Sequence, residues 1–132
     1  MGAILKSTTQ IDKMRIAGGH VAEILQILRE ATRPGITTGE LDSIAEKELA
    51  RRGGVSCFKN YVIRPGVPPF PGVICTSVND EIVHGIPGKR VLKEGDIVAL
   101  DFGASFDGWV GDSGITVAVG QISPQAQHLL DV

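Results

Sequence analysis

The chain lacks the features that mark nucleic-acid-binding, membrane-spanning and disulfide-stabilised proteins. Its formal net charge is −2, so no basic excess points to a nucleic acid or an anionic membrane surface. No apolar run is long enough to span a bilayer, and Met1–Gln10 shows no charged-then-apolar signal peptide. Only two cysteines are present, Cys57 and Cys75, without the spacing of a disulfide framework. We therefore expect free thiols and a cytoplasmic protein.

The length and composition fit one domain. The 132 residues are 42% hydrophobic, which is enough apolar content for a single core. The sequence shows no internal repeat, low-complexity tract or interdomain linker. Ser123-Pro124 starts a helix that has barely turned at Val132. Because domains rarely stop at such a point, we expect residues 1–132 to be the truncated N-terminal part of one longer domain.

The sequence pattern near the start of the chain predicts a long amphipathic helix from about Thr9 to Ala31, with Thr9 as its N-cap. Apolar residues recur there at three- and four-residue steps, at Ile11, Met14, Ala17, Val21, Ile24, Leu25 and Leu28. Gly18-Gly19 in the middle lowers the stability of this helix while permitting close packing. The pattern predicts a helix with one buried flank.

A second helix and several short strands follow. Thr37 and Glu40 have the spacing of a capping box, so a helix begins there and ends at Gly53-Gly54. Four prolines between Arg64 and Pro71 predict a loop on the surface. We predict short strands around this loop, at Ser56–Phe58, Val73–Ser77 and Glu81–Val83.

The strongest strand signal is a β-hairpin over Ile97–Val119. Its turn is Asp107-Gly108, a pair that favours the turn type with positive φ at both central positions. With a two-residue loop, Asp101 faces Gly114 and Asp112 faces Gly103. The opposite face is then an apolar block suited to packing under helices, formed by Val98, Leu100, Phe102, Ile115, Val117 and Val119.

The same register places the two aspartates on one face. Side chains alternate along a strand, so Asp112 shares a face with Gly114 and hence with Asp101. The two Cα atoms are then roughly 7–8 Å apart, and both carboxylates could reach one cation. Like charges so close need a counter-charge, a shared proton or open water. From the residues alone, two interpretations stay open: a metal site, or two polar residues on a half-exposed sheet.

Several motifs resemble those of the type I methionine aminopeptidases. They are Cys75-Thr-Ser-Val-Asn-Asp-Glu-Ile-Val-His84-Gly-Ile-Pro87, Leu92-Lys-Glu-Gly-Asp-Ile-Val98, Leu100-Asp101-Phe-Gly and Asp107-Gly-Trp-Val-Gly-Asp112. Their order and spacing match, and the resemblance covers nearly all of the chain. It implies an α/β (α+β) fold of the pita-bread, or creatinase and aminopeptidase, type. This chain would be its N-terminal half, with two helices followed by an antiparallel sheet.

The resemblance also implies an activity and a site. Family members remove the N-terminal methionine from nascent polypeptides, using two divalent metal ions (Mn²⁺, Co²⁺, Fe²⁺ or Zn²⁺). Two aspartates of the first half hold the metals, together with a histidine and two glutamates of the second. Asp101 and Asp112 match the aspartates, with Asp112 bridging the metals. His84 matches the catalytic histidine that contacts the substrate near its scissile amide, and Cys57 and Tyr61 fall at the substrate pocket.

Some positions depart from the family pattern. Val62 and Val110 stand where family members often have histidines, and the second-half histidine and glutamates have no match in residues 1–132. The proline-rich segment from Val62 to Phe70 lies beside the expected methionine pocket. Three hypotheses follow: one half of a methionyl-peptide-cleaving enzyme, an inactive binding module of the same fold, or a truncated fragment that self-associates through its unfinished half.

The remaining histidines and the cysteines are expected to be structural. His20 lies on the first helix and is expected to be exposed or satisfied locally, and His128 is expected on the surface. Cys57 and Cys75 are expected to act as small buried hydrophobic residues. His84, without the resemblance, is more typical of a hydrogen-bonded structural residue than of a functional one.

Overall fold

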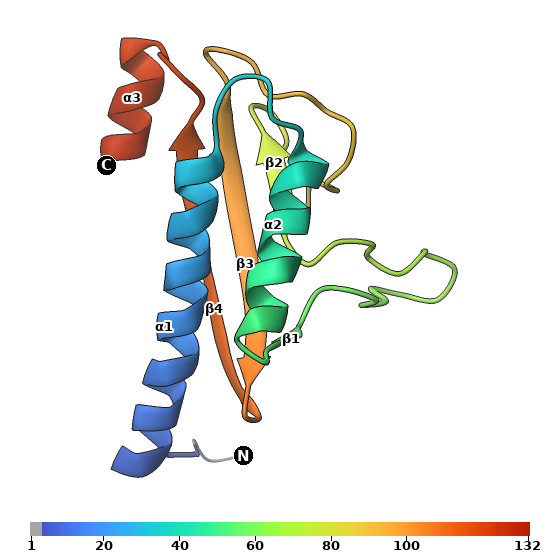
Figure 1. The fold of residues 1–132 in the computed structure, drawn as a ribbon, viewed down its shortest axis with the longest axis vertical. Helices are drawn as coiled ribbons and strands as arrows, with labels where there is room; N and C mark the ends of the chain where they lie inside the picture. Colours follow the sequence, from blue (N-terminus) through green and yellow to red (C-terminus); the bar gives the residue numbers. More distant parts are fainter. Residues whose placement is uncertain (1–3) are drawn as a thin grey trace.

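Two helices precede a four-stranded antiparallel sheet, and a third helix follows it (Figure 1). The computed structural model describes residues 4–132. Its elements in chain order are α1 (Thr8–Ala31), α2 (Thr38–Arg51), β1 (Val55–Ser56), β2 (Cys75–Val78), β3 (Ile97–Phe106), β4 (Trp109–Ala118) and α3 (Pro124–Asp131). The predicted α+β architecture is therefore confirmed.

Strand β3 is the centre of the sheet. One edge pairs with β4 along its whole length, and the other edge is shared by β2 and the short β1. The turn between β3 and β4 is Asp107-Gly108, with φ of 50° and 78°. Both values are positive, as the favoured two-residue hairpin turn requires. The ladder pairs Asp101 with Gly114 and Asp112 with Gly103, which confirms the predicted register.

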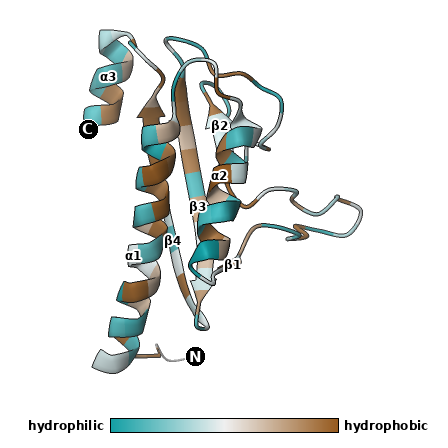
Figure 2. Ribbon diagram, viewed as in Figure 1, coloured by the Kyte–Doolittle hydropathy of each residue, from teal (hydrophilic) through white to brown (hydrophobic). Residues whose placement is uncertain are grey.

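The core lies between the helices and one face of the sheet. Val98, Leu100 and Phe102 of β3 are fully buried, as are Val21 and Ile24 of α1. Figure 2 shows hydrophobic and hydrophilic residues mixed along α1 and α2, as expected for helices with one buried flank. The other face of the sheet is not covered by α1 or α2 (Figure 1).

A glycine allows α1 to approach the sheet at backbone distance. A Cβ atom on Gly111 of β4 would lie 2.7 Å from the carbonyl oxygen of Ala17 and 2.9 Å from the Cα of Gly18. Any larger residue at position 111 would push the helix away from the strand. The close approach therefore depends on Gly111 and not on Gly18, because a Cβ atom on Gly18 would meet no atom within 4 Å.

The start of α1 differs from the prediction. The N-cap is Ser7 rather than Thr9, because Ser7 and Gln10 form a reciprocal capping box at 2.8 Å and 3.3 Å. Ile11 and Met14 are 44% and 41% exposed, although the periodicity assigned them to the buried flank. The first turns of α1 extend past the hairpin turn, where no strand remains to cover them (Figure 1).

The short strands also differ from their predicted bounds. Glu81–Val83 is an exposed loop, because the chain reverses at Asn79, whose φ is 57°. Strand β1 stops at Ser56. The Ser56 side-chain oxygen accepts hydrogen bonds from the backbone N–H groups of Phe58 and Lys59. Val73 and Ile74 are buried but lie outside β2, because their N–H groups donate to the Asp42 carboxylate instead of a strand.

Within the described residues, none of the helices combines the length and hydropathy needed to cross a bilayer.

Candidate active site

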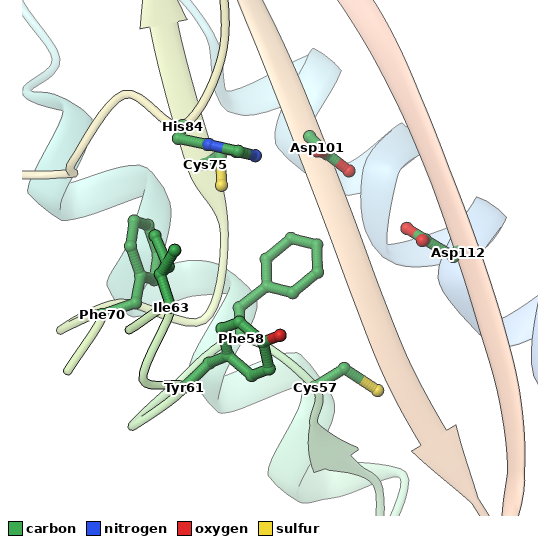
Figure 3. Close-up of a pocket in the computed structure, with 9 residues that line it drawn as sticks. All are labelled: Cys57, Phe58, Tyr61, Ile63, Phe70, Cys75, His84, Asp101 and Asp112. Carbon is green, nitrogen blue, oxygen red and sulfur yellow. The ribbon is translucent and has the colours of Figure 1, made fainter. Parts of the chain in front are cut away.

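Asp101 and Asp112 project from neighbouring strands into one cavity of about 330 Å³ (Figure 3). A wider cavity of about 510 Å³ continues from them along the open face of β3 and β4, as far as Thr116. Among residues 4–132, no ion pair with a lysine, arginine or histidine includes either carboxylate. The structure therefore brings together two accessible acidic groups without a neutralising partner.

Burial and the charge of Asp112 both act on the Asp101 carboxyl group. The pKa of Asp101 is raised, first because its carboxyl group is partly buried and second because Asp112 is close; His84 opposes this effect. A raised pKa means that ionising Asp101 costs more than ionising a free carboxyl group. A divalent cation placed between the carboxylates would remove that cost.

His84 reaches the same cavity from the loop that joins β2 to β3. Its φ is 59°, in the left-handed region that residues other than glycine rarely occupy. The next residue is held against β2, since Thr76 N–H donates to the Gly85 carbonyl at 2.8 Å and Gly85 N–H donates to Ser77 Oγ at 3.0 Å. These bonds hold the backbone next to His84, and its exposed imidazole reaches the cavity that Cys75 also lines (Figure 3).

The rest of the cavity is an apolar wall from the segment after β1. It consists of Cys57, Phe58, Tyr61, Ile63 and Phe70, with Cys75 at the junction with the polar end. Cys57 N–H donates to the Gly103 carbonyl at 3.0 Å, which ties this segment to β3. A Cβ atom on Gly103 would lie 2.9 Å from the Phe58 ring and 3.2 Å from Asp112 Oδ1. Glycine at this position therefore leaves room for both groups.

The two thiols in the cavity are protonated at neutral pH. Burial, followed by the charges of Asp101 and Asp112, raises the pKa of Cys75 to about 11. Burial and then Asp112 raise the pKa of Cys57 as well. Because the thiolate is the nucleophile, these raised pKa values argue against a nucleophilic role for either cysteine. They serve here as apolar lining.

All the predicted site residues line one cavity: Cys57, Tyr61, His84, Asp101 and Asp112. Phe58, Ile63 and Phe70 also line it. The sequence analysis placed the segment Val62–Phe70 beside the pocket but assigned none of these three residues to the site. Their segment has no strand or helix periodicity, so the available signal was Gly103, a strand glycine that implies a close neighbour.

Four other positions considered in the sequence analysis lie elsewhere. Val62 and Val110 are 51% and 53% exposed and do not line the cavity. His128 is exposed on α3, as predicted. The expectation that His20 is exposed or locally satisfied holds only in part. Its side chain is 34% exposed, and its Nδ1 lies 3.9 Å from the Glu23 carboxylate on the same helix but has no hydrogen-bond partner among the described residues. Its ring is tilted by 40° against that of Phe106, with 4.7 Å between centroids.

The donor chemistry fits part of a divalent metal site. Two carboxylates on one face suit Mn²⁺, Co²⁺, Fe²⁺ or Zn²⁺. However, no group of three or more His, Cys, Asp or Glu side chains within residues 4–132 is arranged to hold a metal ion. Asp101 and Asp112 are thus two ligands of a set that needs more.

The fold and this acidic cavity define a class: one half of an α+β metallopeptidase domain of the pita-bread type. The model of metallopeptidase family M24 matches residues 12–132, and the chain belongs to that family.

Relatives of the chain are named methionine aminopeptidases. It is 47% identical to the protein of Aquifex aeolicus over 99% of this chain and 51% of that one. It is 46% identical to methionine aminopeptidase 1 of Bacillus subtilis, over 98% and 50%. The crystal structure of methionine aminopeptidase from Rickettsia prowazekii superimposes with a TM-score of 0.91, at 31% identity, over 98% of this chain and 50% of that one. The predicted resemblance is confirmed, and the chain spans about half the length of the relatives it matches.

Proposed function

We propose that this chain carries part of the active site of a metal-dependent methionine aminopeptidase. The activity would be removal of the N-terminal methionine from nascent polypeptides, by attack of a metal-activated water on the first peptide bond. One observation supports this proposal most: a single cavity with two carboxylates and a histidine at one end and an apolar wall at the other. Such a cavity suits a peptide terminus, which combines a cationic amine with the side chain of the first residue.

In this proposal Asp101 and Asp112 would hold the divalent ions. When bound, such ions supply Lewis acidity and lower the pKa of a coordinated water. The carboxylates also attract the free amine of the peptide and orient it toward the polar end of the cavity. Since the described residues provide only these two ligands, we expect metal binding by the chain alone to be weak.

His84 is the proposed catalytic residue of this chain. Its imidazole lies at the polar end of the cavity, within the same group of side chains as Asp101. We infer that it hydrogen-bonds the scissile amide and assists proton movement there. The left-handed backbone conformation at His84 is consistent with such a role, because strained conformations persist where the surrounding structure holds them for function.

The first side chain of the substrate would lie against Phe58, Tyr61 and Phe70. A methionine side chain is apolar and flexible, and its thioether makes favourable contacts with aromatic rings. The neutral thiols of Cys57 and Cys75 complete this apolar lining. Self-association of the chain through its open sheet face stays a prediction.

Calorimetric titration with Mn²⁺ tests the metal part of this proposal. We expect weak binding by the wild type and none by Asp112→Ala, with Asp80→Ala, an exposed carboxylate outside the cavity, as the matched control. Equal binding by all three proteins would show that the acidic pair is no metal site. We further expect negligible hydrolysis of methionyl peptides by the chain alone. Robust turnover with added Mn²⁺ or Co²⁺ would show that the two aspartates suffice.

A further inference from the structure

A projecting segment, residues 61–70, forms part of the cavity and is called the tongue below. Its root is closed by two backbone hydrogen bonds: Phe70 N–H donates to the Tyr61 carbonyl at 2.9 Å, and Asn60 N–H donates to the Phe70 carbonyl at 2.8 Å. Figure 1 shows the tongue extending away from the sheet and helices. These two hydrogen bonds therefore hold the base of the tongue in place.

The tip of the tongue is a tight turn of a defined type. Val67 N–H donates to the Arg64 carbonyl at 3.2 Å across Pro65 and Gly66. Proline at the second position and glycine with φ of 85° at the third are the signature of a type II turn. Pro68 and Pro69 then restrict the returning arm. The turn and the prolines restrict the backbone of the tongue, which lowers the entropy cost of binding.

Ile63 is the tongue residue that points into the cavity beyond the root. It lines the cavity with Tyr61 and Phe70, yet it is 60% exposed (Figure 3). A large aliphatic side chain in this position loses contact with water only when something fills the cavity. Its neighbour Val62 is 51% exposed but does not line the cavity. The two residues therefore offer a matched comparison on one segment.

We propose that Ile63 is a specificity-determining residue. The tongue holds it against the first side chain of the peptide, so that the outer wall favours a long, unbranched apolar side chain over an aromatic one. This inference rests on the proposed function, because it assumes that the peptide terminus occupies this cavity. Asp101, Asp112 and His84 orient the reacting end, whereas Ile63 limits the size of the side chain at the opposite end.

Binding of two small probes tests the inference without requiring catalysis. Methionine amide and phenylalanine amide are titrated into the 132-residue chain, and amide and methyl chemical shifts are followed by NMR. We expect Ile63→Ala to weaken methionine amide binding at least about threefold, because apolar contact area is lost. The preference for methionine amide over phenylalanine amide should fall by up to about tenfold. Ile63→Met should retain the wild-type preference, and Val62→Ala should bind both probes as the wild type does.

The probe titrations test the role of Ile63 independently of the Mn²⁺ titration. Equal effects of Ile63→Ala and Val62→Ala, or no effect of either, would overturn it. Absence of probe binding to the wild type would overturn it too, even if the Mn²⁺ titration succeeds. Ile63-dependent binding without any Mn²⁺ binding would uphold it while contradicting the metal-dependent chemistry. Because the tongue is exposed, thermal unfolding of all variants should match that of the wild type.

Discussion

Gly103 faces Asp112 across the β3–β4 ladder, and this pairing leaves the Asp112 carboxylate beside Asp101 on the open face of the sheet. The absence of a side chain at position 103 also gives space to the Phe58 ring. One strand glycine thus lets the acidic and aromatic ends of the cavity meet.

Asp112→Asn should lower the pKa of Asp101 in metal-free protein. Asp112 is one of two causes that raise this pKa, so removing its charge leaves only the burial of Asp101 to raise it. The measurement is a carboxyl NMR titration in the presence of a chelator. Asp80→Asn, outside the cavity, should leave the Asp101 titration unchanged. An unchanged pKa in Asp112→Asn would show that the two side chains do not interact.

Gly111→Ala should destabilise the protein by about 1–3 kcal/mol, since the new methyl group would overlap the backbone of α1 at Ala17. Gly18→Ala places a methyl group where no atom lies within 4 Å and adds helix propensity. It should therefore raise the free energy of unfolding by up to about 1 kcal/mol. Urea denaturation compares both variants. Equal stabilities would mean that β4 and α1 are not in backbone contact.

Asp42→Ala should loosen the segment that leads into β2. Asp42 Oδ1 accepts hydrogen bonds from Val73 N–H at 2.7 Å and from Ile74 N–H at 3.1 Å. Leaving buried donors unpaired costs about 1–3 kcal/mol. Asp42→Asn keeps an acceptor oxygen and should lose less of the free energy of unfolding. Hydrogen exchange at Val73 and Ile74 reports the local effect, and unchanged protection in Asp42→Ala would contradict this role.

Asp96 should contribute stability that disappears in acid. Hydrogen bonds from the Asn79 side chain and from Lys93 N–H, both 2.9 Å, lower the pKa of Asp96 in the folded state. Such a carboxylate stabilises the fold above its unfolded-state pKa of about 3.9, and this contribution is lost as the pH falls through the folded value. The wild type should exceed Asp96→Asn in free energy of unfolding at about pH 6, and the gap should narrow at about pH 3.

A matched substitution controls for general acid effects. Asp12→Asn removes an exposed carboxylate of α1 that takes part in no ion pair within residues 4–132. Its small difference from the wild type should not change between the two pH values. If the Asp96→Asn gap is equally constant, the two hydrogen bonds do not favour the ionised form.

Much of the fold could be predicted because its signals are local. The capping box at Thr37 and Glu40, the cap at Ser123 and the turn at Asp107-Gly108 each depend on residues within a few positions. The predicted element bounds were wrong where two local signals competed or where the local signal was weak. The cap at Ser7 outweighed Thr9, and the apolar segment Glu81–Val83 remained a loop because the chain turns at Asn79.

The amino-acid sequence by itself determined that Asp101 and Asp112 share a face. A two-residue turn sets the register, and alternation along the strands does the rest, so no distant contact is needed. Only the tertiary structure decided what surrounds them. Phe58, Ile63 and Phe70 come from a segment without periodicity, which reaches the sheet through single long-range hydrogen bonds such as Cys57 to Gly103. Such bonds leave no repeating pattern in the sequence, because each joins residues far apart along the chain.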